Sequence, residues 1–282
     1  MNRIVWLASY PKSGNTWLRA FLANYLARGV APVDINALPS FAHGDMRIDP
    51  YVTLSGKSAG ELHWDEINAL RPRVQRFLSD TSPARVFVKT HTVLTLIAGL
   101  PTITPEATYA ALYVVRNPLD VAVSFAHHYG LTMDEGVRAV CLPDLQIEPK
   151  DGHILQIISD WSTHVRSWTE ASGLRRCVLR YEDMTTSPQR TFGDAVDFLG
   201  LAREREQLKR AIRQSSFAVL AEQERRSGFV ERSSHAQAFF RRGKVGGYRN
   251  ELSAEQIDTV IKCHRDQMIK LGYLEPDNRL RV

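Results

Sequence analysis

The chain has 282 residues, of which 44% are hydrophobic and 24% charged, a composition typical of a globular protein with roughly one or two domains. No apolar run approaches the roughly 20 residues that span a bilayer, so we expect no membrane span. The net charge of +5 predicts an anionic partner, which at this level is a nucleic acid, a membrane surface or a phosphorylated small molecule.

The first predicted unit is a strand, a turn and a helix. Asn2–Ser9 is short, apolar and rich in β-branched and aromatic residues, which is typical of a buried strand. A polar turn with Pro11 and Gly14 follows. Apolar residues then recur at helical spacing from Trp17 until Gly29, so the segment reads as the start of a βαβ unit.

The same alternation continues along the chain. Further strands are predicted at Arg85–Lys89, Ala110–Val115 and Cys177–Tyr181. Helices are predicted at Asn117–Gly130, around His153–Ala171, at Pro188–Leu199 and from the capping box at Ser253 to Gly272. Strands that alternate with helices predict an α/β fold with a central, mainly parallel sheet, covered by helices on both faces. No repeat or linker divides residues 1–282, so we expect a single domain.

Two long stretches, Val30–Ala84 and Leu131–Gly152, read as irregular. Long loops in a compact domain are usually functional, and we expect these two to form the wall of an acceptor pocket. Packing of peripheral helices is the equal alternative. In parallel sheets ligands bind beyond the carboxyl ends of the strands, where the chemically suggestive residues fall.

The turn after the first strand has the properties of an anion site. Lys12 and Gly14 precede a helix N-terminus, where free N–H groups and the positive end of the dipole attract anions. The order of lysine and glycine differs from the GxxxxGK[ST] nucleotide loop. A plain strand-to-helix turn with a solvated lysine remains the alternative.

Tyr10–Trp17 resembles the 5′-phosphosulfate loop of the soluble sulfotransferases, which use 3′-phosphoadenosine 5′-phosphosulfate (PAPS). Three more segments resemble motifs of that family in the same order: Tyr113–Ser124, Tyr181–Met184, and Phe239–Gly243 with the glycines that follow. The resemblance extends over nearly the whole chain. It implies a P-loop-type three-layer α/β sandwich and a PAPS-dependent sulfotransferase that needs no metal.

The resemblance also implies which residues bind the donor. Arg116 and Ser124 would hold the 3′-phosphate, and Trp17, Tyr181 and Phe217 would contact the adenine. The full implied set is Lys12, Ser13, Gly14, Asn15, Thr16, Trp17, Arg116, Ser124, Tyr181, Ser215, Phe217, Phe239, Phe240, Arg241, Arg242 and Gly243. The family commonly has threonine at the positions of Asn15 and Ser215 and lysine at that of Arg242. Ser215 keeps the hydroxyl, and Arg242 keeps the positive charge.

The segment Lys89-Thr90-His91 follows an apolar strand and resembles the family segment that carries the catalytic base. Along an extended backbone Lys89 and His91 lie on the same side. Histidine is suited to take a proton from an acceptor hydroxyl near neutral pH. Lys12 and Lys89 would offset the charge that develops during transfer. The resemblance therefore implies that His91, Lys12 and Lys89 are catalytic.

The sequence thus predicts a sulfotransferase that acts on a hydroxyl of a small molecule. Three scattered cysteines without CxxC spacing favour the reducing cytoplasm over a disulfide framework or a zinc site. Two other functions stay open: a P-loop small-molecule kinase that uses ATP, and a basic nucleic-acid-binding protein. We expect no nucleic-acid partner. The acceptor and the oligomeric state are left open.

Overall fold

The computed structural model describes residues 3–150 and 152–281, so Asn2 of the first predicted strand lies outside the described residues. A five-stranded sheet in the order β2-β3-β1-β6-β9 forms its centre, and all of its neighbouring strands are parallel. The strands are β1 (Ile4–Ser9), β2 (His43–Gly44), β3 (Val86–Thr90), β6 (Thr108–Val115) and β9 (Arg176–Arg180). The predicted parallel α/β sheet is confirmed.

Side chains of the central strands alternate between two cores, one on each face of the sheet. From β1, Trp6 and Ala8 pack into one hydrophobic cluster, whereas Val5 and Leu7 pack into the other. Every residue of β1 is buried, which explains why its sequence is apolar from Ile4 to Ala8. The fold is therefore a three-layer sandwich.

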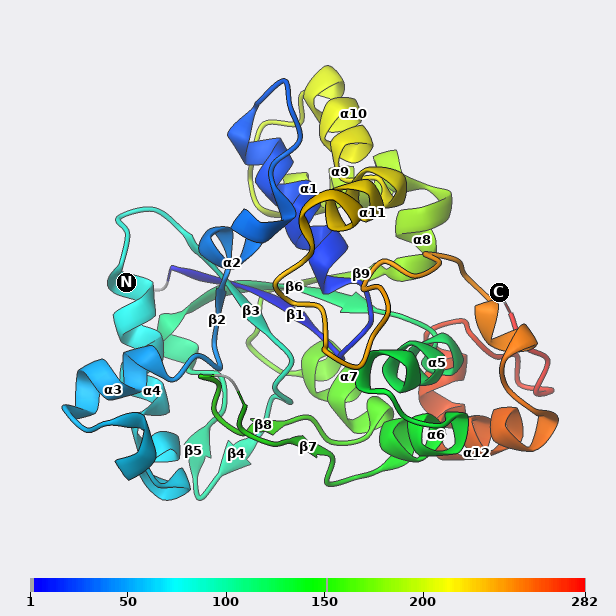
Figure 1. Ribbon diagram of the computed structural model, residues 1–282, viewed down its shortest axis with the longest axis horizontal. Helices are drawn as coiled ribbons and strands as arrows, with labels where there is room; N and C mark the ends of the chain where they lie inside the picture. The colour runs from blue at the N-terminus through cyan, green and yellow to red at the C-terminus, as the bar shows by residue number, and fades with distance from the viewer. Residues whose placement is uncertain (1–2, 151, 282) are drawn as a thin grey trace.

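Helices cover both faces (Figure 1). One face carries α1 (Asn15–Ala27), α8 (Tyr181–Thr186), α9 (Pro188–Phe198) and α10 (Arg205–Gln214), with α11 (Phe217–Ser227) beside them. The other face carries α4 (Trp64–Asp80), α5 (Pro118–Tyr129), α6 (Met133–Cys141), α7 (Trp161–Glu170) and α12 (Ala254–Lys270). No helix of the described residues is long and apolar enough to cross a membrane.

The remaining elements are short. The small helices are α2 (Leu38–Phe41) and α3 (Asp49–Ser55), with 3₁₀ turns η1 (Ile35–Ala37), η2 (Ala59–Glu61), η3 (Pro105–Ala107) and η4 (Gly247–Asn250). Two antiparallel pairs complete the fold: β4 (Leu96–Ile97) with β5 (Leu100–Pro101), and β7 (Gln146–Ile147) with β8 (Gln156–Ile157).

The irregular reading of two stretches is wrong. Residues 30–84 contain α2, α3 and the 17-residue helix α4, and residues 131–152 contain α6. Pro72 inside α4 breaks the usual sequence signature of a helix, although packing on the sheet keeps the helix intact. The helix predicted around His153 begins only at Trp161, because the chain before it pairs as β8 with β7.

Candidate active site

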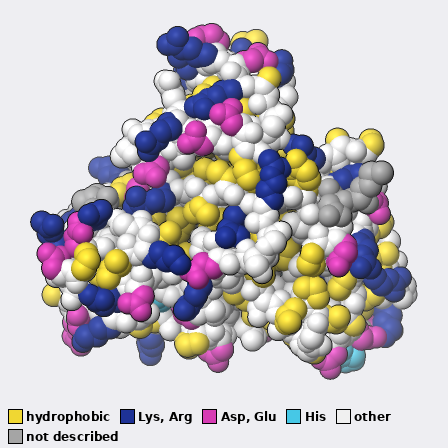
Figure 2. Space-filling view, turned by 180° about the vertical axis from the view of Figure 1, so that it is seen from behind, with side chains coloured by type: hydrophobic (Ala, Val, Ile, Leu, Met, Phe, Trp, Pro, Cys, Tyr) yellow, Lys and Arg dark blue, Asp and Glu magenta, His cyan; other side chains and the backbone are white. Residues whose placement is uncertain are grey.

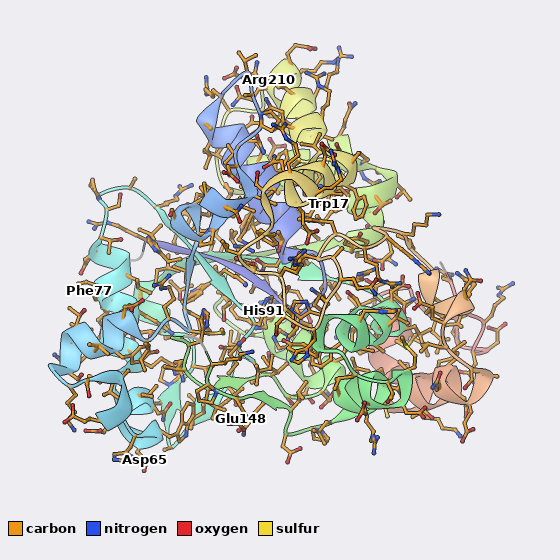
Figure 3. The ribbon with its side chains drawn as sticks, viewed as in Figure 1. Trp17, Asp65, Phe77, His91, Glu148 and Arg210 are labelled. Carbon is orange, nitrogen blue, oxygen red and sulfur yellow. The ribbon has the colours of Figure 1, made fainter. Side chains whose placement is uncertain are left out.

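A cavity of about 600 Å³ opens at the carboxyl ends of the sheet strands. Residues directly after β1, β3, β6 and β9 line it, as expected for a parallel sheet. The predicted residues that line it are Lys12, Gly14, Asn15, Thr16, Trp17, Lys89, His91, Arg116, Ser124, Tyr181, Phe217, Phe239, Phe240, Arg241, Arg242 and Gly243. Figure 3 shows Trp17 and His91 near the centre of the molecule.

Two predicted residues lie behind this lining. Ser13 is fully buried, and its Oγ has no hydrogen-bond partner among the described residues. Ser215 is also fully buried, and its hydroxyl donates to the carbonyl of Ala211 (2.8 Å). The next residue, Ser216, lines the cavity instead.

The turn after β1 is shaped by its backbone. Lys12 and Gly14 both have positive φ, 66° and 109°. A Cβ at Gly14 would lie 2.7 Å from the ring of Tyr181, so only glycine fits there. The Asn15 amide donates to the Leu7 carbonyl (2.7 Å) and fastens the turn to β1. No side chain caps α1, and although the Trp17 N–H donates to the Gly14 carbonyl (3.0 Å), the N–H groups of Asn15 and Thr16 are available to an anion.

Positive charge is concentrated in the cavity. Burial, together with the charges of Lys89 and Arg116, lowers the pKa of Lys12 to about 7. The Lys12 ammonium lies 4.0 Å from the centre of the Phe239 ring. A bound anion would relieve this mutual repulsion, so the cluster favours an anionic ligand.

Arg116 is held at the end of β6 by a stacked ring and by backbone carbonyls. Its guanidinium lies 4.3 Å from the centre of the Tyr181 ring and donates to the carbonyls of Lys12 and Lys244, each at 3.2 Å. Trp17 meets the same tyrosine edge-on, with ring centres 5.6 Å apart. Aromatic and cationic groups thus form one wall, a combination that suits a purine nucleotide.

Residues 228–246, here called the cap loop, connect α11 to η4 and contribute Phe239, Phe240 and Gly243 to the cavity (orange-yellow in Figure 1). The Glu224 carboxylate accepts the N–H groups of Phe239 (2.8 Å) and Phe240 (2.9 Å). Gly243 has a φ of 60°, and a Cβ there would come within 2.3 Å of the Phe217 ring. The loop therefore packs directly against the start of α11.

Two further carboxylates hold the far end of the cap loop. Asp120 accepts the N–H groups of Gly246 (2.8 Å) and Tyr248 (3.0 Å). The Oε1 atom of Glu251 pairs with the guanidinium groups of Arg241 (3.0 Å) and Arg242 (2.8 Å). The predicted phosphate-binding arginines thus already have a carboxylate partner at the rim.

Another carboxylate of the region lines the cavity. Glu231, on the cap loop, accepts hydrogen bonds from the two terminal guanidinium nitrogens of the fully buried Arg19, at 2.7 and 2.6 Å. Its second oxygen lies 3.3 Å from Lys89 Nζ. Neither Arg19 nor Glu231 was singled out by the sequence motifs, because the pair joins α1 to a loop more than two hundred residues away.

His91 is held in one tautomer. Its Nδ1 lies 2.8 Å from the Ser9 carbonyl oxygen, which can only accept, so Nδ1 carries the proton and Nε2 keeps a lone pair. Burial, then the charge of Lys89, holds the pKa of His91 well below its usual value of 6.5. A neutral imidazole with a free basic nitrogen beside a lysine is suited to general-base catalysis.

The cavity lining also contains residues that no sequence motif assigned individually. Met46, His128, Tyr129, Ile147 and Gln156 are among them. Met46 lies in the turn between β2 and α3, and Ile147 lies on β7, so each belongs to one of the two stretches expected to line an acceptor pocket. His128 on α5 and Gln156 on β8 lie outside those stretches. Among the described residues, no group of three or more His, Cys, Asp and Glu side chains could hold a metal ion.

The chain matches known proteins over most of its length. The sulfotransferase domain family matches residues 2–272. Cytosolic sulfotransferase 13 of Arabidopsis thaliana is 27% identical over 276 residues, which cover 91% of this chain and 75% of that protein. Sulfotransferase 1A1 of Mus musculus is 27% identical over 263 residues, 89% of this chain and 80% of that protein. A mouse sulfotransferase solved in complex with PAP has a TM-score of 0.61 at 21% identity and covers 95% of this chain and 84% of that one.

Proposed function

The chain belongs to the sulfotransferase domain family, and we propose that it transfers the sulfuryl group of PAPS to a hydroxyl of a small molecule. The family predicted from the four motifs is confirmed by this match. One observation carries the proposal: residues that separate motifs assign, from Lys12 to Gly243, line one cavity. The mouse relative's complex with PAP, the product nucleotide of this reaction, is the corresponding support from comparison.

The cavity residues fit an anionic nucleotide. Lys12, Lys89 and Arg116 are among the cations that line it, and the pKa of Lys12 is lowered by burial and by the charges of the other two. The Nε atom of Arg116 is buried without a hydrogen-bond partner among the described residues. These groups would hold the phosphates and the sulfuryl group, and Trp17 and Phe217 would lie against the adenine.

We infer the following division of labour. When bound, PAPS supplies a sulfuryl group attached to a phosphate leaving group. His91 Nε2 takes the proton of the acceptor hydroxyl while the acceptor oxygen forms a bond to sulfur and the bond from sulfur to the phosphate oxygen breaks. The ammonium groups of Lys12 and Lys89 stabilise the negative charge that moves onto the oxygens of the sulfuryl and leaving groups. The Ser9 carbonyl keeps His91 in the required tautomer.

The test separates chemistry from binding. His91→Ala should abolish sulfuryl transfer, followed as the mass gain of hydroxylated compounds, while the variant still binds PAP. Turnover close to that of the unaltered protein would remove His91 from the role of base.

The kinase alternative makes a different prediction. If the protein uses PAPS, PAP should raise its melting temperature more than ATP with magnesium does. A ligand at about 100 times its Kd adds about 2.7 kcal/mol to the free energy of unfolding, so the difference is measurable. The nucleic-acid alternative predicts a surface patch of positive charge. The face shown in Figure 2 instead mixes Lys and Arg with Asp and Glu.

A cytoplasmic location is part of the proposal, supported by the free thiols of Cys141, Cys177 and Cys263.

A further inference from the structure

The main chain of His91 is held by a second histidine, which no sequence motif singles out. His164, on α7, has its Nε2 3.0 Å from the carbonyl oxygen of His91. Its Nδ1 lies 2.9 Å from the hydroxyl of Tyr113. Because a carbonyl oxygen can only accept a hydrogen bond, Nε2 of His164 carries the proton and Nδ1 accepts from the Tyr113 hydroxyl. Both ring nitrogens of His164 are therefore satisfied.

These contacts close a ring of hydrogen bonds around His91. The Ser9 carbonyl accepts the Nδ1 proton of His91 (2.8 Å). The next residue, Tyr10, hydrogen-bonds the Tyr113 hydroxyl through its backbone. Tyr113 in turn donates to His164, which donates to the His91 carbonyl. One connected network from β1, the turn after it, β6 and α7 thus holds both the imidazole ring and the peptide group of His91.

His164 acts from outside the cavity. Its side chain is fully buried, and so is that of Tyr113. No ligand atom can reach either group, so any effect of His164 on the reaction passes through His91. Burial also lowers the pKa of His164 to about 4, so at neutral pH the ring keeps the uncharged form that this network needs.

The residues on both sides of His91 have anchors of their own. The Thr90 hydroxyl donates to the buried carboxylate of Asp45 (2.6 Å), and the Trp168 indole N–H donates to the Thr92 carbonyl (3.0 Å). Loss of the histidine contact would therefore free the peptide group of His91 without releasing the rest of the segment.

We propose that His164 is a positioning residue for the base: it fixes the peptide group of His91 and thereby the direction in which Nε2 of His91 faces the acceptor hydroxyl. This inference rests on the proposed sulfuryl transfer and adds a residue to that site. A misplacement of about 1 Å can cost about a hundredfold in rate. A residue that orients the base but touches no ligand should affect kcat and leave the binding of both substrates unchanged.

The experiment compares two substitutions of His164, with PAPS as donor and 2-naphthol as the probe acceptor. The amide nitrogen of glutamine comes near the position of Nε2 and can donate to the His91 carbonyl, whereas the shorter asparagine reaches only towards Tyr113. His164→Asn should lower kcat about tenfold or more, with KM for 2-naphthol and Kd for PAP within about twofold of the unaltered protein. His164→Gln should restore most of kcat.

His264→Asn is the matched control. His264 lies on α12, is only 1% exposed, and its Nδ1 pairs with the Ser162 hydroxyl (2.9 Å) rather than with the chain around His91. This variant should lose a comparable amount of stability, measured as melting temperature, and keep its kcat. Equal losses of kcat in the two asparagine variants, or no recovery in His164→Gln, would overturn the inference.

A second measurement needs no turnover and separates this inference from the proposed function. Magnetic resonance of isotope-labelled histidine rings reports the tautomer and pKa of His91, whose signals are identified by their loss in His91→Ala. Burial is the first cause of the low pKa of His91, followed by the charge of Lys89. A freed peptide group lets water reach the ring, so His164→Asn should move this pKa towards the usual value of 6.5, and His264→Asn should leave it in place.

Each result decides between the two claims. If 2-naphthol is not sulfated, the proposed function fails for this acceptor, and the shift in the pKa of His91 alone then supports the positioning role of His164. An unchanged tautomer and pKa of His91 in His164→Asn would overturn that role, whether or not the protein transfers sulfuryl groups.

Discussion

Glu231 Oε2 lies 3.3 Å from Lys89 Nζ, so the cap loop places a carboxylate inside the cationic cluster of the cavity. Burial alone would raise the pKa of Glu231, but the charges of Lys89 and Arg19 outweigh it and hold that pKa well below its usual range. Glu231 is therefore an anion at neutral pH. It supports the ammonium form of Lys89, whose pKa burial lowers and Glu231 raises.

We predict that Glu231→Gln binds PAP more tightly. Like charges about 8 Å apart at an effective dielectric constant near 20 repel by about 2 kcal/mol, so removing the carboxylate should lower Kd about tenfold after screening by salt. Loss of the loop contact opposes this gain, but Glu224 and Asp120 still anchor the cap loop. Isothermal titration with PAP measures the change.

The control for this charge change is Glu222→Gln, an exposed residue of α11 that pairs with Arg225 on its own helix. It should leave Kd unchanged. Because Arg19 is fully buried and loses its counter-ion, Glu231→Gln should also melt earlier without ligand, so Kd is measured well below its melting temperature. Weaker PAP binding by Glu231→Gln would show that the carboxylate closes the loop rather than competing with the ligand.

The pH dependence of turnover follows from His91. A general base is active when unprotonated, and burial with the Lys89 charge keeps the pKa of His91 well below 6.5. Activity should therefore be lost only as pH falls through a value below 6.5, and the acid limb of kcat/KM against pH should lie there. An acid limb centred at 6.5 or above would contradict the role of His91 as the base.

Arg116 should favour binding of nucleotides with a 3′-phosphate over those without one. Arg116→Ala should weaken binding of PAP by about tenfold or more, and binding of adenosine 5′-monophosphate far less, because a charged hydrogen bond is worth about 1.5–3 kcal/mol. Competition binding with both nucleotides measures the two losses. Arg190→Ala, at an exposed position of α9, is the control. Equal losses for both nucleotides would place Arg116 elsewhere along the ligand.

Gly243→Ala should weaken nucleotide binding by displacing the cap loop. Its φ of 60° already strains a side chain, and the added Cβ would lie 2.3 Å from the Phe217 ring. Gly56→Ala separates backbone strain from the steric contact, since Gly56 also has a positive φ (72°) but nothing within 4 Å of its added Cβ. PAP affinity should fall only in Gly243→Ala. Unchanged affinity there would mean that the Phe217 ring moves aside.

The free energy of unfolding should decrease in acid more steeply than protonation of carboxylates alone would cause. Burial lowers the pKa of His164 and His264 to about 4, below the unfolded value near 6.5. Between these values the unfolded chain binds protons that the folded protein does not, so the free energy of unfolding falls as pH falls, by up to about 1.4 kcal/mol per pH unit for each histidine. Urea unfolding at several pH values measures the free energy of unfolding. In His264→Gln this free energy should change less steeply with pH.

The sequence predicts the part of the cavity that follows the sheet strands better than the part contributed by loops and short elements. Lys12, His91, Arg116 and Tyr181 each follow a strand whose apolar pattern is recognisable, and parallel strands end at one edge. Glu231 and Gln156 lie on elements without such a pattern, and only tertiary packing brings them to the cavity. Ser215 shows the limit of motif transfer, because its neighbour Ser216 faces the cavity instead.

The parallel sheet has two ends with different surroundings: the cavity opens at the carboxyl ends of the strands, and the amino ends lie away from it. The residues that line the cavity from the sheet follow the carboxyl ends of their strands, whereas the turn from α4 into β3 lies at the opposite edge and is exposed at Pro83, Ala84 and Arg85. Exposed turns of this kind tolerate a cut in the chain. The turn before β3 is thus a natural place to divide the protein into two fragments, with Lys12 on one, His91 on the other, and their reunion readable as regained nucleotide binding.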